Sequence, residues 1–579
     1  MSDRLTQKGR NLLMQIGRES RQLIAAVVVF GFFVNLLMLA GPLYILNVYD
    51  RVLSSRSVET LVALTLLLAF VYIMMGILDY VRGRIMGRVG AEFQTALDKP
   101  VFDATLRATR LRQMPEQAAT GVQDLEAAQR LITSPALLAL FDLPWVPLFF
   151  LGIFVFHPIL GFLALGGAAL ILTLAVLNQY ALRRHVGAAQ TAHLAAENIS
   201  TQIRAEGGLV LSMGLRSAAF DRWHHARDRS LACNMTATDT SGAFTAIIKS
   251  FRLFLQSAIL GLGAYLVLQN QLSAGAMIAS SILMGRALAP IEAVIGQWGV
   301  IQRGWAGWTN LAVLLGHFPP EKQRLGLPRP DARLVVDQLT VVPPGSQIPV
   351  VRLVSFAVDG GSAVGIIGPS GAGKSSLARA MTGAWPHAAG RIQLGDAGLD
   401  QYDADALGQY IGYLPQRVQL FDGTVKENIA RLSAKPDDQK VLAAAKAAAA
   451  HDLILGLSDG YDTVISDGGR HLADGAVQRI GLARALYGDP VMVVLDEPNA
   501  SLDHAGTIAL NRVIAGLKAE GKIVFIATHH PSGIEHCDML LVLEKCVRKA
   551  FGPKTLVLAE VVRNHQDIAH HTGKAGALA

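Results

Sequence analysis

Six apolar stretches constrain the fold of this 579-residue chain more than any other feature of its sequence. They cover residues 23–46, 58–78, 136–156, 158–177, 244–267 and 274–295. A helix of about 20 mostly apolar residues crosses the hydrocarbon core of a bilayer, so each stretch is long enough to span a membrane. The sequence therefore predicts a membrane domain of six helices, in a chain in which 51% of the residues are hydrophobic.

The connections between these stretches differ in charge. The connection 79–135 contains eight lysine or arginine residues and the connection 178–243 contains seven, whereas the three short connections contain only Arg51 and Arg56. Basic residues beside membrane spans favour the cytoplasmic side. We therefore expect the N-terminus, both long connections and everything after the sixth span to be cytoplasmic. The basic loops and the membrane lipid around them explain the net charge of +7, so no nucleic-acid partner is expected.

Four ionisable residues fall inside the predicted spans. Lys249 and Arg252 lie near the cytoplasmic edge of the fifth span and are expected to extend their charged ends to the interface. Arg286 and Glu292 lie deeper in the sixth span. An unpaired charge in hydrocarbon is costly, so these two residues either line a polar pathway or form an internal salt bridge.

A phosphate-binding pattern lies beyond the spans. The chain fills every fixed position of the P-loop G-x-x-x-x-G-K-[ST], after a strand-type run at 363–367 and before a helix-compatible segment at 377–382. In this pattern Lys374 can reach the β- and γ-phosphates of ATP, and Ser375 can hold Mg²⁺. The expected nucleotide-binding residues are Gly368, Pro369, Ser370, Gly371, Ala372, Gly373, Lys374, Ser375 and Ser376.

An acidic pair, Asp496 and Glu497, follows the apolar strand-type run 491–495. At the end of a buried strand, Asp496 is well placed to hold Mg²⁺, and Glu497 can polarise an attacking water. A second such run, 523–527, leads to Thr528 and His529. His529 can contact the γ-phosphate, although a histidine at a strand end is often only structural.

The order of the motifs resembles that of an ABC transporter nucleotide-binding domain. The matching motifs are the P-loop, Tyr413-Leu414-Pro415-Gln416, the Asp474-Gly475 turn before Gln478-Arg479, Asp496-Glu497, Ser501-Leu502-Asp503 and Thr528-His529. With six spans ahead of it, the whole chain resembles an ABC exporter half-transporter. The implied fold is a membrane α-helical domain fused to an α/β P-loop nucleotide-binding domain. We expect a cytoplasmic segment 1–22, a transmembrane domain 23–318, a linker 319–333, a nucleotide-binding domain 334–565 and a polar tail 566–579.

The resemblance also implies roles for the motif residues. Two halves are needed, because in this family each ATP is closed between the P-loop of one half and the signature loop of the other. Coupling helices are expected near 120–126 and 206–215. The implied site residues are Gln416 in the Q-loop near nucleotide and metal, Asp474 and Gly475 in the signature region, Glu497 as catalytic base, Asp503 in the D-loop and His529 as the H-loop switch.

Finer features resemble one branch of the family. Tyr49-Asp50-Arg51-Val52-Leu53, Phe141-Asp142-Leu143-Pro144-Trp145 and Leu420-Phe421-Asp422-Gly423-Thr424 are similar to the inner-membrane ATPase of type I protein secretion systems, in the PrtD-like branch that exports proteases and lipases. That resemblance implies a bacterial inner-membrane location, an unfolded polypeptide substrate with a C-terminal signal, a periplasmic membrane-fusion adaptor and an outer-membrane channel. Only about 22 residues precede the first span, so we expect no leader-cleaving peptidase domain.

The signature motif departs from the family pattern. It reads Leu472-Ala473-Asp474-Gly475-Ala476 where the family has Leu-Ser-Gly-Gly-Gln. The lost hydroxyl and the added negative charge should weaken closure around the triphosphate, because one charge-assisted hydrogen bond contributes about 1.5–3 kcal/mol. Cys546 replaces an expected glycine, and no aromatic residue near 341–343 can stack on adenine.

Several functional alternatives follow from these departures. The chain is either a slow homodimeric exporter or one half of a heterodimer whose other half has an intact signature. An exporter of lipids or drugs with the same architecture is the main rival to polypeptide secretion. A regulator that binds nucleotide without turnover fits least well, because Glu497 is present.

Overall fold

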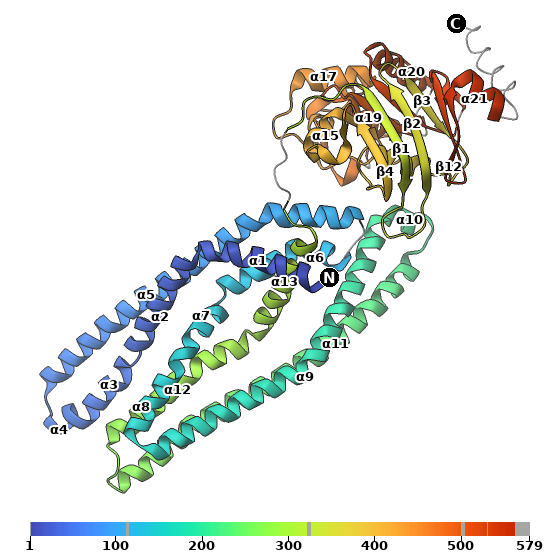
Figure 1. Ribbon diagram of the computed structural model, residues 1–579. Helices are drawn as coiled ribbons and strands as arrows, with labels where there is room; N and C mark the ends of the chain where they lie inside the picture. Colours follow the sequence, from blue (N-terminus) through green and yellow to red (C-terminus); the bar gives the residue numbers. More distant parts are fainter. Residues whose placement is uncertain are drawn as a thin grey trace. The chain divides into compact units, whose positions relative to one another are not determined.

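The chain forms two compact units in a computed structural model (Figure 1). One unit comprises Met1–Thr105 and Glu116–Pro319, and the other comprises Leu106–Pro115 and Pro320–Ala579. The structure describes residues 2–111, 115–320, 326–469, 471–499, 504–529 and 531–561. The expected tail 566–579 and part of the expected linker therefore lie outside the described residues.

The membrane unit is entirely helical within these described residues, and its longest helices have 54, 48 and 53 residues. At 1.5 Å per residue these helices are about 70–80 Å long, more than twice the thickness of a bilayer core. The helices are α1 (Ser2–Glu19), α2 (Arg21–Leu37), α3 (Ala40–Asn47), α4 (Leu53–Ser55), α5 (Val58–Leu111), α6 (Pro115–Thr133), α7 (Pro135–Asp142), α8 (Val146–Phe156), α9 (Pro158–Ala205), α10 (Gly207–Ser212), α11 (Arg216–Leu268), α12 (Ala274–Gly296) and α13 (Trp298–His317).

Six helical segments are long and apolar enough to cross a membrane, which confirms the predicted number of spans. They are Arg21–Ser55, Val58–Leu111, Pro135–Phe156, Pro158–Ala205, Arg216–Leu268 and Ala274–Gly296. The first segment contains a π-helical turn at Val48–Val52, and the third contains a 3₁₀ turn at Leu143–Trp145. Side chains from α8, α9, α11 and α12 form a common apolar core, which includes Phe149, Ile171, Ile259 and Met284.

Two ion pairs join helices of the membrane unit. Arg252 on α11 and Glu292 on α12 form an ion pair with a Nε–Oε1 distance of 2.8 Å. A carboxylate on the neighbouring helix therefore neutralises Arg252, a pairing that the sequence did not predict. Arg82 on α5 is 1% exposed, and its Nη2 donates to Oδ1 of Asp142 at 2.9 Å.

The second unit is an α/β domain with three sheets. A six-stranded sheet has the order β12-β11-β3-β10-β9-β6, a four-stranded sheet has the order β2-β1-β4-β5, and β7 pairs with β8. The strands are β1 (Arg333–Val341), β2 (Val351–Asp359), β3 (Ala363–Ile367), β4 (Ala389–Leu394), β5 (Ala397–Gly398), β6 (Ile411–Leu414), β7 (Gly423–Thr424), β8 (Val464–Ile465), β9 (Met492–Asp496), β10 (Ile523–Ala527), β11 (Met539–Glu544) and β12 (Val547–Pro553).

Eight α-helices accompany these strands in the described part of the domain. They are α14 (Lys374–Met381), α15 (Ala404–Tyr410), α16 (Val425–Ile429), α17 (Asp438–Ala447), α18 (His451–Leu455), α19 (Asp474–Leu486), α20 (His504–Ala519) and α21 (Lys554–Val561).

The central strands are apolar because both faces of the six-stranded sheet are covered. Every residue of β9 and β10 is buried. Val493 and Leu495 belong to one apolar core, whereas Met492 and Val494 belong to another, as the two-residue period of a strand requires. Strands buried on both sides read as continuous apolar runs, which is why the sequence identified them.

Strand order brings the motifs together. β3, β10, β9 and β6 are consecutive neighbours and run parallel, so their carboxyl ends lie at one edge of the sheet. The P-loop follows β3, His529 follows β10, Glu497 follows β9 and Gln416 follows β6. Ligands of open α/β sheets bind at this edge.

Candidate nucleotide-binding and hydrolysis site

The P-loop is a tight turn in which two glycines are sterically required. Gly368 has φ +153°, and a Cβ there would lie 2.2 Å from the carbonyl oxygen of Leu543. Gly373 has φ +99°, and a Cβ there would lie 2.3 Å from the carbonyl oxygen of Val350. The turn leads directly into α14, so its backbone N–H groups and the positive end of the helix dipole face the same space. Such a loop is suited to binding phosphate.

Lys374, the first residue of α14, is held within the loop. Its Nζ donates to the carbonyl oxygens of Gly368 at 2.9 Å and Pro369 at 3.2 Å. Only 8% of the residue is exposed. The loop carbonyls therefore fix the ammonium group beside the N-terminus of the helix, where it adds positive charge to the phosphate-binding turn.

Ser375 and Asp496 form the second part of the site. The hydroxyl of Ser375 donates to Oδ1 of Asp496 at 3.0 Å. Asp496 is 1% exposed, and its Oδ2 has no hydrogen-bond partner among the described residues. Burial raises the pKa of the Asp496 carboxyl, the neighbouring Glu497 adds to the rise, and the bond from Ser375 opposes it. A buried oxygen without a partner, next to a hydroxyl, is suited to a hard cation.

Glu497 is the third part, and two donors hold its carboxylate. Nε2 of Gln416 lies 2.7 Å from Oε2, and Nδ1 of His529 lies 3.0 Å from Oε1. Glu497 also has φ +52°, a left-handed conformation that costs a non-glycine residue about 1–3 kcal/mol. Its N–H donates to the carbonyl oxygen of Ala527 at 2.8 Å, so neighbouring strand β10 stabilises this conformation. The backbone and two side chains thus fix the direction of the carboxylate.

The signature residues lie at a different helix. Asp474 and Gly475 begin α19, which packs against α16, α17 and β6, whereas α14 packs against β1, β9 and β10. Ala473 occupies the N-cap position with an extended backbone, and alanine has no oxygen to cap the helix. Both Ala473 and Asp474 are exposed. The N-terminus of α19 is therefore open to a ligand or a partner.

The structure adds two contacts that sequence patterns did not predict. The first is the bond between Gln416 and Glu497. The second joins the signature helix to the acidic strand: Nε2 of buried Gln478 donates to the carbonyl oxygen of Pro498 at 3.3 Å. Its position in the motif was visible in the sequence, but its partner was not. Asp503, the expected D-loop residue, lies outside the described residues.

The two expected coupling segments have different surroundings. The short helix α10 (Gly207–Ser212) lies at the turn between α9 and α11, within 206–215. Residues 120–126 lie inside α6, where Thr120 and Asn310 both donate to Oδ2 of Asp124 at 2.8 and 3.1 Å. Residues 112–114, which precede α6, lie outside the described residues. The coupling helix expected near 120–126 therefore stays a prediction.

Comparison with known proteins identifies both parts of the chain. Residues 351–500 match the family model described as ABC transporter, and residues 24–289 match the model described as ABC transporter transmembrane region. The fold is similar to a solved bacterial Atm1-family ABC exporter with ATP bound, with a TM-score of 0.77 at 19% identity over 95% of this chain and 98% of that one.

Two curated relatives indicate the branch. The chain is 39% identical to the type I secretion system ATP-binding protein PrsD of Rhizobium meliloti, over 97% of both chains. It is 25% identical to the leukotoxin translocation ATP-binding protein LktB of Mannheimia glucosida, over 91% of this chain and 75% of LktB. The chain therefore belongs to the ABC transporter family, in the type I secretion branch, as an ATP-driven exporter with six inner-membrane spans and a cytoplasmic ATPase domain.

Proposed function

We propose that the chain uses ATP hydrolysis to move an unfolded polypeptide with a C-terminal signal out of the cytoplasm, as the inner-membrane component of a type I secretion system. The observation that carries this proposal is the arrangement of Glu497, Gln416 and His529 beside the Ser375–Asp496 pair. These residues are the catalytic groups that one half contributes to hydrolysis, and all of them are present despite the altered signature. The similarity to PrsD supports secretion as the use of that energy.

Mg²⁺ fits the pair of Ser375 and Asp496. Among the described residues there is no group of three or more His, Cys, Asp or Glu side chains that could hold a metal ion. Mg²⁺ binds with one or two protein oxygens, with phosphate oxygens and water completing its octahedron, so a hydroxyl and one buried carboxylate are sufficient. When bound, the ion neutralises charge on the β- and γ-phosphates.

The other residues act on phosphate and water. Lys374 and the P-loop N–H groups bind the phosphates and orient the γ-phosphate. Glu497 accepts a proton from the attacking water, and the bonds from Gln416 and His529 hold its carboxylate in position for that transfer. Asp503 would act from the facing half, as the resemblance implies.

A dimer completes the site. The exposed N-terminus of α19 belongs to another part of the domain than the P-loop, so a second half has to bring a signature loop to the nucleotide. We favour a homodimer working with a periplasmic membrane-fusion adaptor and an outer-membrane channel. The absence of a cap oxygen at Ala473 supports the alternative that a different half with an intact signature is the partner.

The lipid or drug exporter is the weaker alternative. Its expected feature is a large apolar cavity in the membrane unit. A cavity in that unit is lined by Asn234, Thr238, Ser241, Thr245 and Lys249 as well as by apolar residues. The amide, hydroxyl and ammonium groups can bind a peptide, beside a lining surface that is mostly apolar.

Hydrolysis and transport can be tested together in inside-out inner-membrane vesicles. The wild-type chain should take up a fluorescent unfolded polypeptide with ATP, and Glu497→Gln should bind ATP but fail in both hydrolysis and uptake. Glu520→Gln is the matched control, because this exposed glutamate pairs with Lys522 just before β10 begins and so lies at the opposite edge of the sheet from the P-loop. Uptake of a lipophilic dye but of no polypeptide would contradict the proposal.

A further inference from the structure

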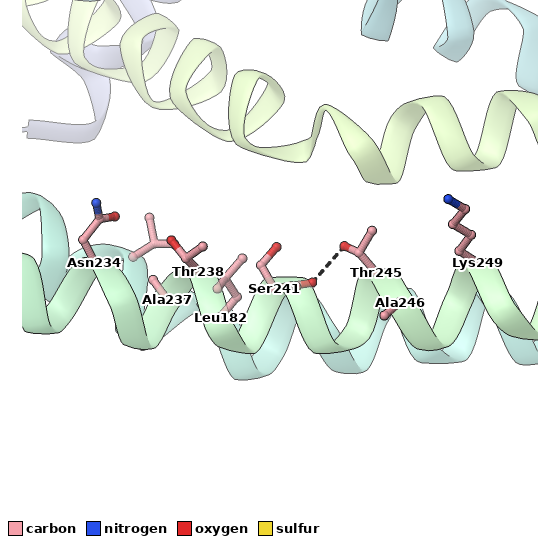
Figure 2. Close-up of a pocket in the computed structure, with 10 residues that line it drawn as sticks. Leu182, Asn234, Ala237, Thr238, Ser241, Thr245, Ala246 and Lys249 are labelled. Atoms are coloured by element: carbon pink, nitrogen blue, oxygen red, sulfur yellow. Dashed lines mark hydrogen bonds between the residues drawn. The ribbon is translucent and has the colours of Figure 1, made fainter.

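A shallow cavity of about 620 Å³, open to its surroundings, lies along α9 and α11 in the membrane unit (Figure 2). Two of its residues come from α9 and eight from α11. The lining residues are Leu182, Val186, Asn234, Ala237, Thr238, Ser241, Gly242, Thr245, Ala246 and Lys249.

The polar lining residues form one continuous row on α11. Asn234, Thr238, Ser241, Thr245 and Lys249 are spaced three or four residues apart, so they lie on one face of the helix. Figure 2 shows their side chains rising from the same side of α11. We call these five residues the α11 polar row.

The α11 polar row extends from the cytoplasmic part of the helix into the membrane. Asn234, Thr238 and Ser241 precede the apolar stretch that begins at 244, and Thr245 and Lys249 lie within it. Polar groups at membrane depth are costly when they face lipid. A row that crosses this boundary on one face is therefore suited to a polar solute that enters from the cytoplasm.

Lys249 gives the cavity a net positive charge. None of the ten described lining residues is acidic. The carboxylate on the adjoining helix, Glu292, is already paired with Arg252 at 2.8 Å. Lys249 is exposed and projects from the same face as the hydroxyl groups (Figure 2). The chemistry that would complement this site is a carboxylate.

The rest of the row suits a peptide backbone. Thr245 donates its hydroxyl hydrogen to the carbonyl oxygen of Ser241 on its own helix at 2.8 Å, which leaves its oxygen lone pairs open to a donor. Asn234 has both donor and acceptor atoms, and Thr238 and Ser241 have hydroxyl groups. Amide and hydroxyl groups can bond to the backbone of an extended chain of any sequence.

We propose that the α11 polar row contacts the exported polypeptide as it enters the membrane, and that Lys249 pairs with its acidic side chains or its terminal carboxylate. This inference rests on the proposed export of an unfolded polypeptide and adds a preference for acidic segments. The row hydrogen-bonds to the backbone irrespective of sequence, and Lys249 supplies the charge selectivity.

Photo-crosslinking tests the contact directly. Benzoylphenylalanine is placed at Thr238 in the full chain in nanodiscs, and an unstructured peptide of about 20 residues rich in Asp, Ser and Gly is the probe. Ala243 is the matched control position, since it is exposed and lies about 2.5 turns from Asn234, on the opposite face of α11. We expect peptide adducts at Thr238 and none at Ala243.

Charge selectivity is tested with the same peptide and with a version that has Asn in place of Asp. Lys249→Gln should raise the concentration for half-maximal crosslinking of the acidic peptide by about fivefold, the value of an exposed ion pair of about 1 kcal/mol, and leave the neutral peptide unchanged. Lys249→Arg should restore the preference. Arg229→Glu is the control, because Arg229 is exposed and lies about 5.5 turns away on the opposite face.

The outcomes separate this inference from the proposed function. Adducts at Ala243 as strong as those at Thr238, equal response of both peptides to Lys249→Gln, or adducts only between two copies of the chain would overturn the inference. Polypeptide uptake in vesicles would then still stand. Failure of polypeptide uptake by the wild-type chain would instead overturn the proposed function.

Discussion

Gln416 donates a hydrogen bond of 2.7 Å from Nε2 to Oε2 of Glu497. The other carboxylate oxygen of Glu497 lies 3.0 Å from Nδ1 of His529. Gln416 follows β6 and His529 follows β10, the strands on either side of β9, and together they hold both oxygens of one carboxylate. If both bonds persist while the carboxylate takes up a proton from water, removing either one should slow hydrolysis.

The first prediction is a non-additive loss in Gln416→Ala and His529→Ala. Each variant removes a charge-assisted bond of about 1.5–3 kcal/mol, so we expect kcat to fall by roughly 10- to 100-fold in each. Because both donors act on one carboxylate, the double variant should lose less than the product of the single losses. Gln439→Ala, at an exposed glutamine of α17, is the control. Strictly multiplicative losses would show that the two donors act independently.

The second prediction concerns Asp496 and pH. Burial raises the pKa of this carboxyl, so at mildly acidic pH a larger fraction is protonated than for an ordinary aspartate. A protonated carboxyl is a poor magnesium ligand. The apparent affinity for Mg²⁺ should therefore begin to fall at a higher pH than an ordinary aspartate would cause, and excess Mg²⁺ should restore binding. The measurement is Mg²⁺-dependent ATP binding in the Glu497→Gln variant, which lacks the catalytic base. An apparent Mg²⁺ affinity that does not change with pH would contradict the prediction.

The third prediction uses the stability of the metal-free chain. A raised pKa means that ionised Asp496 destabilises the folded state, fully at pH above its folded pKa and not at all below its ordinary value. Asp496→Asn should therefore raise the unfolding temperature at about pH 8, with a gain that shrinks as pH falls. It should also abolish hydrolysis. Asp400→Asn, at an exposed position, is the control. If Asp496→Asn instead unfolds at a lower temperature than the wild-type chain at high pH, then contacts in the folded state stabilise the ionised carboxylate.

The fourth prediction separates two roles of the altered signature. Ala473 is the N-cap of α19, so Ala473→Ser should stabilise the domain by about 1 kcal/mol and speed hydrolysis if a homodimer forms the site. Asp474 lies in the first turn, where its charge favours the helix by about 0.3–1 kcal/mol. Asp474→Gly should therefore lower the unfolding temperature slightly while raising kcat. No change in kcat in either variant would favour a partner half with its own signature.

Local patterns in the sequence predicted much of the fold and of the site. The six spans, the P-loop and the buried strand before Asp496 depend on runs of adjacent residues, and the structure has all of them. The pairing of Gln416 with Glu497 spans 81 positions and exists because β6 lies next to β9. Strand order is a property of the whole sheet, so no local pattern could predict that contact.

Contacts in the membrane unit were also beyond local patterns, because they depend on how helices pack against one another. Arg252 and Glu292 were each recognised as charges inside a span, but their pairing depends on how α11 packs against α12. Asp142 was identified only as part of a motif, and its hydrogen bonds from two other helices could not be predicted from that motif. The sequence predicted which charges are costly, and only tertiary packing decided how they are neutralised.

The fifth prediction concerns Arg82 and Asp142. Oδ1 of Asp142 accepts bonds from Arg82 on α5 at 2.9 Å and from Asn35 on α2 at 2.8 Å, so one carboxylate joins three helices. Removing one partner of a buried ion pair leaves the other charge uncompensated, which costs about 3–5 kcal/mol. Arg82→Met and Asp142→Leu should each lower the unfolding temperature strongly in nanodiscs.

The double variant and a surface pair complete this test. Arg82→Met combined with Asp142→Leu leaves no buried charge, and Asn35 keeps its bond to the carbonyl oxygen of Gly31 at 2.8 Å, so most of the lost stability should return. Arg130→Met breaks the exposed pair with Glu126 and should change stability by no more than about 0.5 kcal/mol. If the double variant is as unstable as the sum of the single variants, the two side chains stabilise the unit through separate contacts, and the ion pair does not link the three helices.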